Sequence, residues 1–379
     1  MPQTQAPKPR RTPPSSQPRR AGAARRKVRE QSRSQARRSR QAGAPARRVG
    51  LSPVGVGAAV GAVVALLIGV ALVTGFLTPP GGSGRGAAPA ATFQAVVHSE
   101  AASVAFDDSG GWAADDRDAT VRHFDPGSGQ FIGRAIPVGQ RPIAVATGYG
   151  RVWVADTSGS QVFAIDPARG KVVGSPTAVP QGPVSVAVGD GGVWVASLLA
   201  GTVTLLDPHT RQVKATAALP DGAVRLIIGP NGVWVSGQTD TLTRVDPRPE
   251  GLSLRWRTVR VGKGPIGVTS GAGSVWVANV QSGTVSRVDP AAVRVTATFQ
   301  AGTTGAGTPS NPEFVAVWQD KLWVADGQQG VVIALDPSTG HATGAPVQLS
   351  GVIRQLTVDA TGSMWGTTAN PGSVVRFST

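Results

Sequence analysis

From residue 92 onward, short apolar runs alternate with glycine, aspartate and proline, and the whole pattern recurs about every 41 residues. One tryptophan marks each recurrence, at Trp112, Trp153, Trp194, Trp234, Trp276, Trp323 and Trp365. Their spacings are 41, 41, 40, 42, 47 and 42 residues. An Asp-Pro pair follows six of them by 12 or 13 residues, beginning at Asp125, Asp166, Asp207, Asp246, Asp289 and Asp336. A fixed period of this length indicates a repeat architecture.

Each unit predicts four short β-strands. In the second unit, apolar runs cover residues 142–148, 151–156, 161–166 and 171–173, and Gly, Asp and Pro separate them. Val and Ile dominate these runs, which favours strands, and no helical periodicity appears outside residues 54–77. Four strands per unit, repeated seven times, predict an all-β fold: a seven-bladed β-propeller over residues 92–379.

The two ends of this region predict how the ring closes. The seventh unit supplies three apolar runs, at 355–359, 364–367 and 374–377, and no fourth run follows them. The run Thr92–Val97 precedes the first unit and has no counterpart in the other repeats. We expect it to be the outer strand of the seventh blade, because pairing the two ends would remove exposed strand edges.

Residues 54–77 are 24 consecutive residues without a charged side chain. At about 1.5 Å rise per residue, a helix of this length crosses the roughly 30 Å hydrocarbon core of a bilayer. We expect a single transmembrane helix over 51–78, followed by a Gly/Ser/Ala/Pro linker over 79–91. A cleaved signal peptide is the alternative, although signal peptides have apolar regions of about 7–15 residues and short basic starts.

The positive charge of the chain is concentrated at its N-terminus. Residues 1–50 hold 15 Lys and Arg and one acidic residue, whereas residues 92–379 carry 21 basic and 21 acidic side chains. The tail is rich in Pro, Gln, Ser and Ala, so we expect it to be disordered. The positive-inside rule then predicts a cytoplasmic tail and an extracytoplasmic propeller, single-pass in the cell membrane. Anionic inner-leaflet lipid is the expected partner of the tail, and nucleic acid is the less favoured one.

Residues 273–290 read GSVWVANVQSGTVSRVDP, an aromatic-Val-Ala-Asn strand followed by a second strand that ends in Asp-Pro. Residues 138–142, VGQRP, and 261–265, VGKGP, form a Val-Gly-x-x-Pro approach to an inner strand. These segments resemble the YVTN-type propeller repeat. Similar repeats occur in bacterial surface proteins, in extracellular sensor domains of membrane-bound Ser/Thr kinases and in streptogramin B lyases. The resemblance implies a bacterial propeller, and the chain contains no kinase motif.

The residues that recur in every unit are predicted to be structural. A tryptophan on the second strand fills the wedge between neighbouring blades, and Asp before Pro opens a turn by accepting backbone N–H groups. Trp318 breaks the pattern, since it stands where Gly148 and Gly189 stand in their units. We therefore take Trp318 as a candidate for an exposed or functional ring.

The composition restricts the chemistry that the propeller can carry. The chain has no cysteine, and its histidines are His98, His123, His209 and His341. None of the four begins an inner strand, where streptogramin B lyases carry a histidine, and this departure counts against lyase activity. No metalloprotease, serine-hydrolase or P-loop motif is present. We therefore predict no catalytic residues, no metal and no cofactor.

The candidate binding residues lie in the loops that precede inner strands and in those that join second to third strands. They are Arg141, Asp221, Lys263, Glu313 and Arg354 from the first kind of loop, with Gln281 and Asp326 from the second. We expect the first five to occupy equivalent places in their repeats and to face a shared opening. The predicted function is non-catalytic recognition of a small molecule, glycan or protein at the cell surface. The alternative is a propeller lyase or lactone hydrolase that uses the central mouth.

Overall fold

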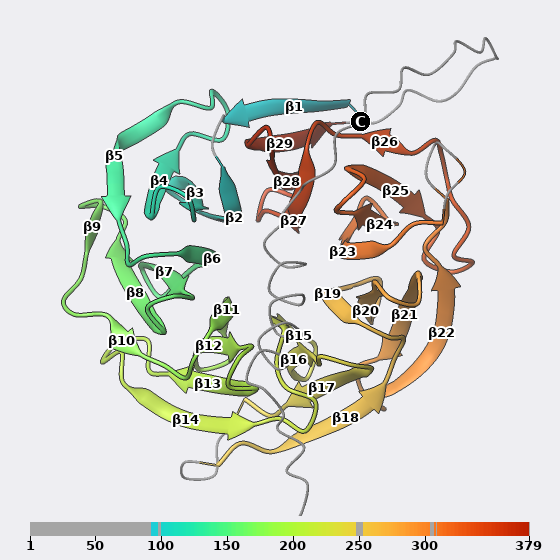
Figure 1. Ribbon diagram of the computed structural model, residues 1–379, viewed down its shortest axis with the longest axis horizontal. Helices are drawn as coiled ribbons and strands as arrows, with labels where there is room; N and C mark the ends of the chain where they lie inside the picture. Colours follow the sequence, from blue (N-terminus) through green and yellow to red (C-terminus); the bar gives the residue numbers. More distant parts are fainter. Residues whose placement is uncertain (1–91, 98–99, 248–252, 304–306, 308, 379) are drawn as a thin grey trace, which may run out of the picture. The chain divides into compact units, whose positions relative to one another are not determined.

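The described chain forms seven antiparallel sheets arranged around a central axis (Figure 1). The computed structural model describes residues 100–247, 253–303, 307 and 309–378, together with the backbone of 92–97. The tail, the transmembrane helix and the linker predicted over 1–91 lie outside these residues and stay predictions. Within the described residues, no helix is long and apolar enough to cross a membrane. The prediction of an all-β seven-bladed propeller is confirmed.

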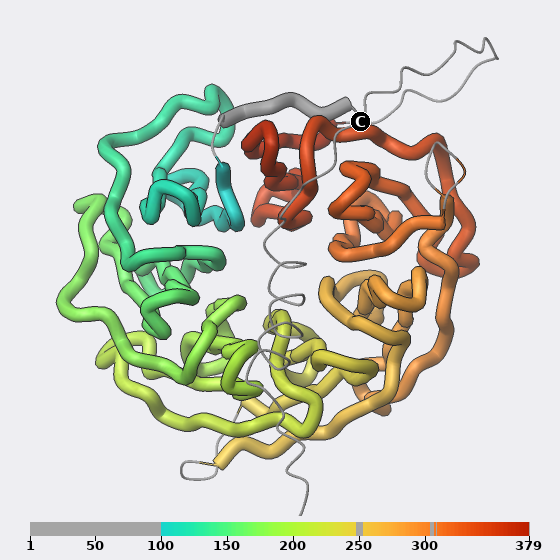
Figure 2. The backbone as a smooth tube through the Cα atoms, viewed as in Figure 1, coloured from blue at the N-terminus to red at the C-terminus, as the bar shows by residue number. Residues whose placement is uncertain are grey.

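Each sheet is one blade, numbered here from 1 to 7 in chain order. The chain passes round the ring once, so that blades adjacent in sequence are adjacent in space (Figure 2). The inner strands are β2 (Ala101–Asp107), β6 (Pro142–Gly148), β11 (Pro183–Gly189), β15 (Arg225–Gly229), β19 (Pro265–Gly271), β23 (Pro312–Trp318) and β27 (Val352–Val358). The second strands are β3 (Gly110–Asp115), β7 (Arg151–Asp156), β12 (Gly192–Ser197), β16 (Gly232–Ser236), β20 (Ser274–Asn279), β24 (Lys321–Asp326) and β28 (Met364–Ala369).

The third and outer strands complete the blades. The third strands are β4 (Thr120–Phe124), β8 (Gln161–Asp166), β13 (Thr202–Leu206), β17 (Thr241–Val245), β21 (Thr284–Asp289), β25 (Val331–Leu335) and β29 (Ser373–Ser378). The outer strands are β5 (Phe131–Pro137), β9 (Lys171–Val172), β10 (Thr177–Ala178), β14 (Val213–Ala218), β18 (Trp256–Arg260), β22 (Arg294–Gln300), β26 (Val347–Gln348) and β1 (Thr92–Val97). Blade 2 divides its outer edge between β9 and β10, which both pair with β8.

The ring closes in blade 7, where the two ends of the propeller pair. β1 runs antiparallel to β29, with Thr92 opposite Ser378 and Phe93 opposite Phe377. The sequence prediction that Thr92–Val97 supplies the missing outer strand is therefore confirmed. On the inner side of the same junction, the Gln355 amide bonds the backbone of β2: Val104 N donates to Oε1 at 2.6 Å, and Nε2 donates to Val104 O at 3.2 Å.

The recurring tryptophans form the packing between blades. All seven are at most 3% exposed. Six of the indole N–H groups donate to the hairpin before their own strand, for example Trp276 Nε1 to Gly271 O at 3.0 Å. This confirms their structural role. Trp318 is also buried, at 6% exposure, and its Nε1 donates to Gly362 O of blade 7. The prediction of an exposed Trp318 ring is wrong, because the ring fills space between blades 6 and 7.

The Asp-Pro pairs open turns between third and outer strands, as predicted. Asp207 Oδ1 accepts the backbone N–H groups of His209 and Thr210 at 2.9 and 2.8 Å. The same pattern of two consecutive backbone donors occurs at Asp125, Asp289 and Asp336. These hydrogen bonds hold the carboxylates in their charged form, and the pKa of Asp207 falls from 3.8 to about 2.

Candidate functional site

All inner strands begin on one face of the propeller, which we call the mouth face. It comprises the loops before the inner strands and the hairpins between second and third strands. Five of the seven inner strands carry a one-residue β-bulge at their start, which leaves unpaired Ala102, Ile143, Val184, Glu313 and Arg354. In blade 5 the irregularity covers Ile266 and Gly267. Bulges redirect side chains and are frequent beside functional sites.

The register corrects the expected equivalence of the candidate residues. Glu313 and Arg354 are matched positions of blades 6 and 7, 41 residues apart. Asp221 and Lys263 share one other position, since their carbonyl oxygens accept the equivalent backbone N–H groups of Gln238 and Gln281, and Arg141 occupies the position after it. Arg225 of blade 4 stands one place further along its inner strand: it pairs with Ser236, as Phe314 pairs with Ala325 and Gln355 with Thr367. The sequence analysis missed Arg225 because it lies inside a strand.

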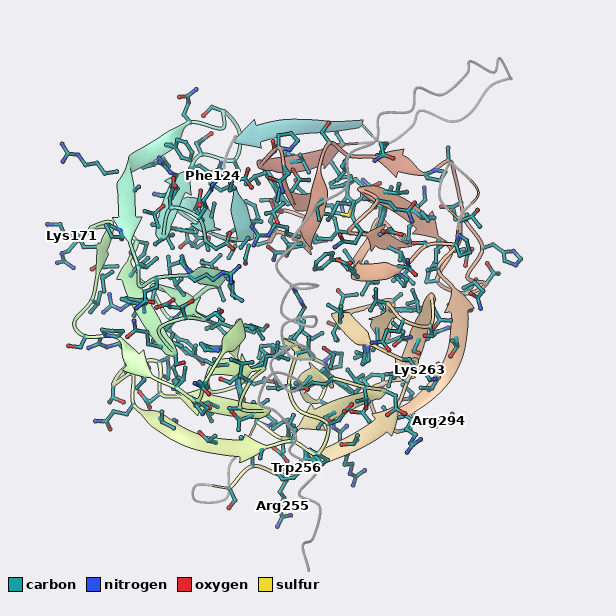
Figure 3. All side chains as sticks on the ribbon, viewed as in Figure 1. Phe124, Lys171, Arg255, Trp256, Lys263 and Arg294 are labelled. Carbon is teal, nitrogen blue, oxygen red and sulfur yellow. The ribbon has the colours of Figure 1, made fainter. Side chains whose placement is uncertain are left out.

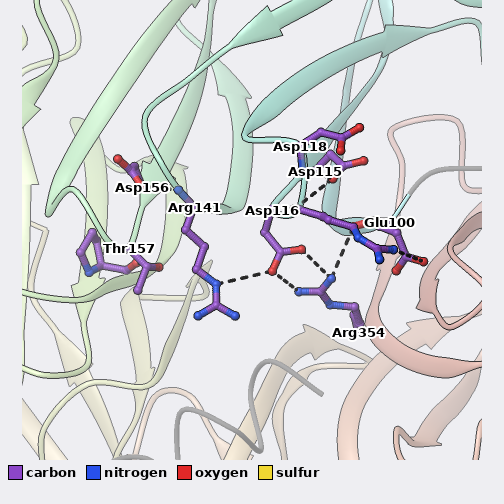
Figure 4. Close-up of polar contacts among 10 residues, drawn as sticks. Glu100, Asp115, Asp116, Asp118, Arg141, Asp156, Thr157 and Arg354 are labelled. Carbon is purple, nitrogen blue, oxygen red and sulfur yellow. Dashed lines mark hydrogen bonds and ion pairs between the residues drawn. The ribbon is translucent and has the colours of Figure 1, made fainter. Parts of the chain in front are cut away.

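Three of the charged residues meet across three blades. Arg354 binds Asp116 with both terminal nitrogens, Nη1 to Oδ1 at 2.8 Å and Nη2 to Oδ2 at 2.9 Å (Figure 4). Arg141 Nε lies 3.7 Å from Oδ2 of the same carboxylate. The Arg354 and Asp116 side chains are 8% and 10% exposed, whereas that of Arg141 is 34% exposed. One buried carboxylate therefore joins blades 7, 1 and 2, and two guanidinium groups share it.

Glu313 is buried at the bulge of blade 6, with 2% of its surface exposed. Burial raises the pKa of its carboxyl from 4.5 to about 7, and the Asp326 carboxylate adds to the rise. A hydrogen bond from Gln328 Nε2 to Oε1, at 3.3 Å, and the charge of Arg225 oppose it. Glu313 is thus a carboxyl group that changes charge near neutral pH.

Arg225 lines the central channel from blade 4. Its guanidinium carbon lies 5.1 Å from the ring centroid of Phe314, which belongs to blade 6. Between them in the ring is blade 5, where Gly267 allows close approach of β23: a Cβ on Gly267 would lie 2.6 Å from Glu313 O. Burial lowers the pKa of Arg225 from 12.5 to about 10, and the Glu313 charge opposes this. The side chain remains cationic at neutral pH.

Two of the predicted site residues, Asp326 and Asp221, form hydrogen bonds within the mouth-face loops. Asp326 is fully buried and accepts the backbone N–H groups of Asn311 and Gln329, at 2.9 and 3.0 Å. Asp221 accepts both the backbone N–H and the hydroxyl of Thr239, and it also accepts the hydroxyl of Thr241. Burial acts to raise the pKa of Asp221, but these hydrogen bonds outweigh it, so the pKa falls. Both carboxylates hold hairpins of the mouth face in place.

Lys263 and Gln281 are the exposed members of the predicted set. They face each other in blade 5, where Gln281 N donates to Lys263 O at 3.1 Å. Lys263 forms no ion pair with any described residue, and Figure 3 labels its position. The ammonium group of Lys263 and the amide of Gln281 are therefore open to an external partner on this part of the mouth face.

A cavity of about 570 Å³ follows the propeller axis and is lined by the inner strands of all seven blades. Most lining residues are small or aliphatic, but the surface that they expose to the channel is mainly polar. Of its lining side chains, Arg225 is the basic one and Asp359 the acidic one. Arg225 begins β15, whereas Asp359 follows the end of β27, so the two charges lie at opposite ends of the channel. A cavity of this volume is typical for small-molecule ligands.

Among the residues that the structure describes, no histidine lines the central channel. His123 stacks on Trp112, with ring centroids 4.0 Å apart and planes 1° apart, and its Nε2 lies 2.9 Å from Ser109 O. This histidine packs on the outer side of blade 1, away from the channel lining. Among the residues that the structure describes, no group of three His, Asp or Glu is placed to hold a metal ion.

The fold is shared with proteins of known structure. No protein-family profile matches the chain, and no curated protein matches its sequence. A streptogramin B lyase superposes with a TM-score of 0.63 at 14% identity, covering 76% of this chain and 97% of the lyase. Virginiamycin B lyase from Staphylococcus aureus gives 0.64 at 13%, with 76% and 99% covered. The WD40 β-propeller domain of Doa1 gives 0.61 at 14%, with 76% and 97% covered. At these identities the likeness shows that the chain shares the β-propeller fold of the streptogramin B lyases and WD40 domains.

Proposed function

We propose that this protein is a membrane-anchored propeller that binds a ligand, without chemical turnover, on a mouth face held outside the cytoplasm. The observation that carries the proposal is the contrast between two kinds of repeat position. The tryptophan position is uniform and buried in every blade. The bulge position at the start of the inner strands varies through Ala102, Ile143, Val184, Glu313 and Arg354, and the first three of these residues line the axial cavity. Variation among positions that share an opening is suited to recognition of one specific ligand.

The membrane part of the proposal rests on the sequence. Residues 54–77 are uncharged and follow a tail with 15 basic residues. Protease added to intact protoplasts should remove the propeller and spare residues 1–50. The opposite protection pattern would contradict the topology and leave ligand binding on the mouth face to be judged separately.

Ligand recognition is tested by capture on intact cells, with the full chain as bait and mouth-face variants for comparison. A combined variant Arg141→Ala, Lys263→Ala and Gln281→Ala changes side chains that are at least partly exposed, so folding should be preserved. We expect binding of the captured glycan, small molecule or protein to fall at least about tenfold. The matched control is Arg257→Gln, an exposed arginine on the outer strand β18. Unchanged binding by the folded triple variant would remove the mouth face as the site.

One observation favours the alternative, a propeller lyase or lactone hydrolase. A carboxyl group whose pKa is about 7, as for Glu313, can act as an acid or a base at neutral pH. Turnover of a lactone or cyclic depsipeptide by the wild type, lost in Glu313→Gln, would establish an enzyme in place of a binding protein.

A further inference from the structure

Arg225 is a partly buried cation whose guanidinium donors are not used by the described residues. Its guanidinium donates no hydrogen bond to any described residue, and its contacts are the Phe314 ring and the charge of Glu313. Arg354, by comparison, has both terminal nitrogens on Asp116. A guanidinium group carries five N–H donors in a planar arrangement, so these donors are available to an acceptor that enters the channel. The donors of Arg225 therefore face the channel with no protein acceptor.

The surroundings of Arg225 define what could bind there. The channel beside it holds about 570 Å³, and the surface that its inner strands expose is mainly polar, with Ser103, Ser185 and Thr147 among the lining residues. Phe314 covers one face of the guanidinium at 5.1 Å, so the planar edge remains for a ligand. A guanidinium edge matches the two oxygens of a carboxylate.

We infer that Arg225 anchors a small monocarboxylate ligand that extends into the central channel. The inference deepens the proposed function, on which it rests, by naming the anchoring residue and the chemical class of the ligand. One negative charge on the ligand neutralises one guanidinium. A doubly charged phosphate is disfavoured, because its second charge would have no cation here and would lie close to Glu313.

Glu313 couples this subsite to pH. Burial and three groups act on its carboxyl: Arg225 from β15, and Asp326 and Gln328 from the β24–β25 hairpin. Below pH 7 the carboxyl is protonated, and the charge of Arg225 is free to attract a ligand carboxylate. Above pH 7 the Glu313 carboxylate competes for the same cation. Carboxylate affinity therefore falls as the pH rises through about 7.

The test is a titration of the purified full-length chain, in a non-ionic detergent, with butyrate and with its neutral counterpart butyramide. We expect saturable binding of butyrate at pH 6 by ligand-observed NMR, at least tenfold stronger than that of butyramide, and weaker binding at pH 8. Arg225→Gln should abolish the preference for butyrate, whereas Arg257→Gln on the outer edge of the same blade should retain it. Glu313→Gln should bind butyrate equally at pH 6 and pH 8. Inorganic phosphate should bind more weakly than butyrate.

Several results would overturn the inference. They are equal binding of butyrate and butyramide by the wild type, retention of the butyrate preference in Arg225→Gln, and phosphate binding tighter than butyrate. The wild-type comparison needs no variant, so it decides the matter even where Arg225→Gln fails to fold. A captured ligand that depends on Lys263 and Gln281 but not on Arg225 would overturn the subsite alone and leave the proposed function standing.

Discussion

Arg354 and Asp116 are 238 residues apart in sequence, yet they form a bidentate ion pair at 2.8 and 2.9 Å with both side chains about nine-tenths buried. The pair joins the inner strand of blade 7 to the mouth-face hairpin of blade 1, across the junction at which the ring closes. The pair therefore holds the two ends of the ring together near the central axis, and the pairing of β1 with β29 holds them together at the outer edge. Closure of the ring therefore depends on contacts both near the axis and at the outer edge.

Removal of the shared carboxylate should destabilise the propeller strongly. Asp116→Ala leaves the Arg354 guanidinium buried without its anion, and breaking a buried pair in this way costs about 3–5 kcal/mol. Urea unfolding of the variant should show that loss in the free energy of unfolding. Arg117→Ala is the control, because Arg117 is 75% exposed and lies 3.9 Å from Glu100. Its effect should stay within about 0.5 kcal/mol. Comparable losses in the two variants would contradict a special role for Asp116.

Deletion of residues 92–97 should expose the edge of β29 and open the ring. The deletion removes a complete strand ladder, so we expect aggregation or a fall in Tm of at least roughly 10 °C. Deletion of residues 1–50 is the matched control and should leave the Tm of the propeller unchanged. A normal melting curve after deletion of 92–97 would mean that β1 is dispensable for closure.

Glu313 predicts a pH dependence of stability between about pH 4.5 and pH 7. The folded-state pKa is raised from 4.5 to about 7, so the folded protein binds this proton more tightly than the unfolded chain does. The resulting stabilisation is complete below pH 4.5 and is lost as the pH rises through 7, with a magnitude of about 3 kcal/mol. Unfolding in urea should show a smaller decline from pH 5 to pH 8 for Glu313→Gln than for the wild type. Parallel pH profiles would show that Glu313 is ionised throughout this range.

Two tryptophans of blade 4 predict opposite outcomes for the same substitution. Trp234 is fully buried and donates to Pro230 O at 2.9 Å, whereas Trp256 is 40% exposed at the outer edge (Figure 3). Trp234→Ala should cost about 3–5 kcal/mol of unfolding free energy, since it leaves a large cavity between blades. Trp256→Ala should cost less than about 1 kcal/mol. Similar values in chemical denaturation would contradict the assignment of Trp234 to blade packing.

The repeat made the fold accessible from sequence alone. Each blade places its tryptophan on the second strand, and six of the seven place an Asp-Pro pair in the turn after the third strand, so local patterning and period were sufficient to predict blade number and strand order. The pairing of Thr92–Val97 with β29 could also be predicted, because one unit lacked a strand and one strand lacked a unit. These features follow from interactions that recur in every blade.

The site was harder to predict from the sequence, because its interactions form where side chains of different blades meet. The sequence placed Glu313 and Arg354 on the mouth face, but it could not show that one is buried beside Arg225 and that the other is committed to Asp116. It also suggested an exposed Trp318, which the packing of blade 7 covers. Arg225 was hidden by its position inside a strand. Periodicity thus determined the propeller and its closing strand, whereas only the tertiary structure decided which charges are paired, because that depends on contacts across the ring that no local pattern encodes.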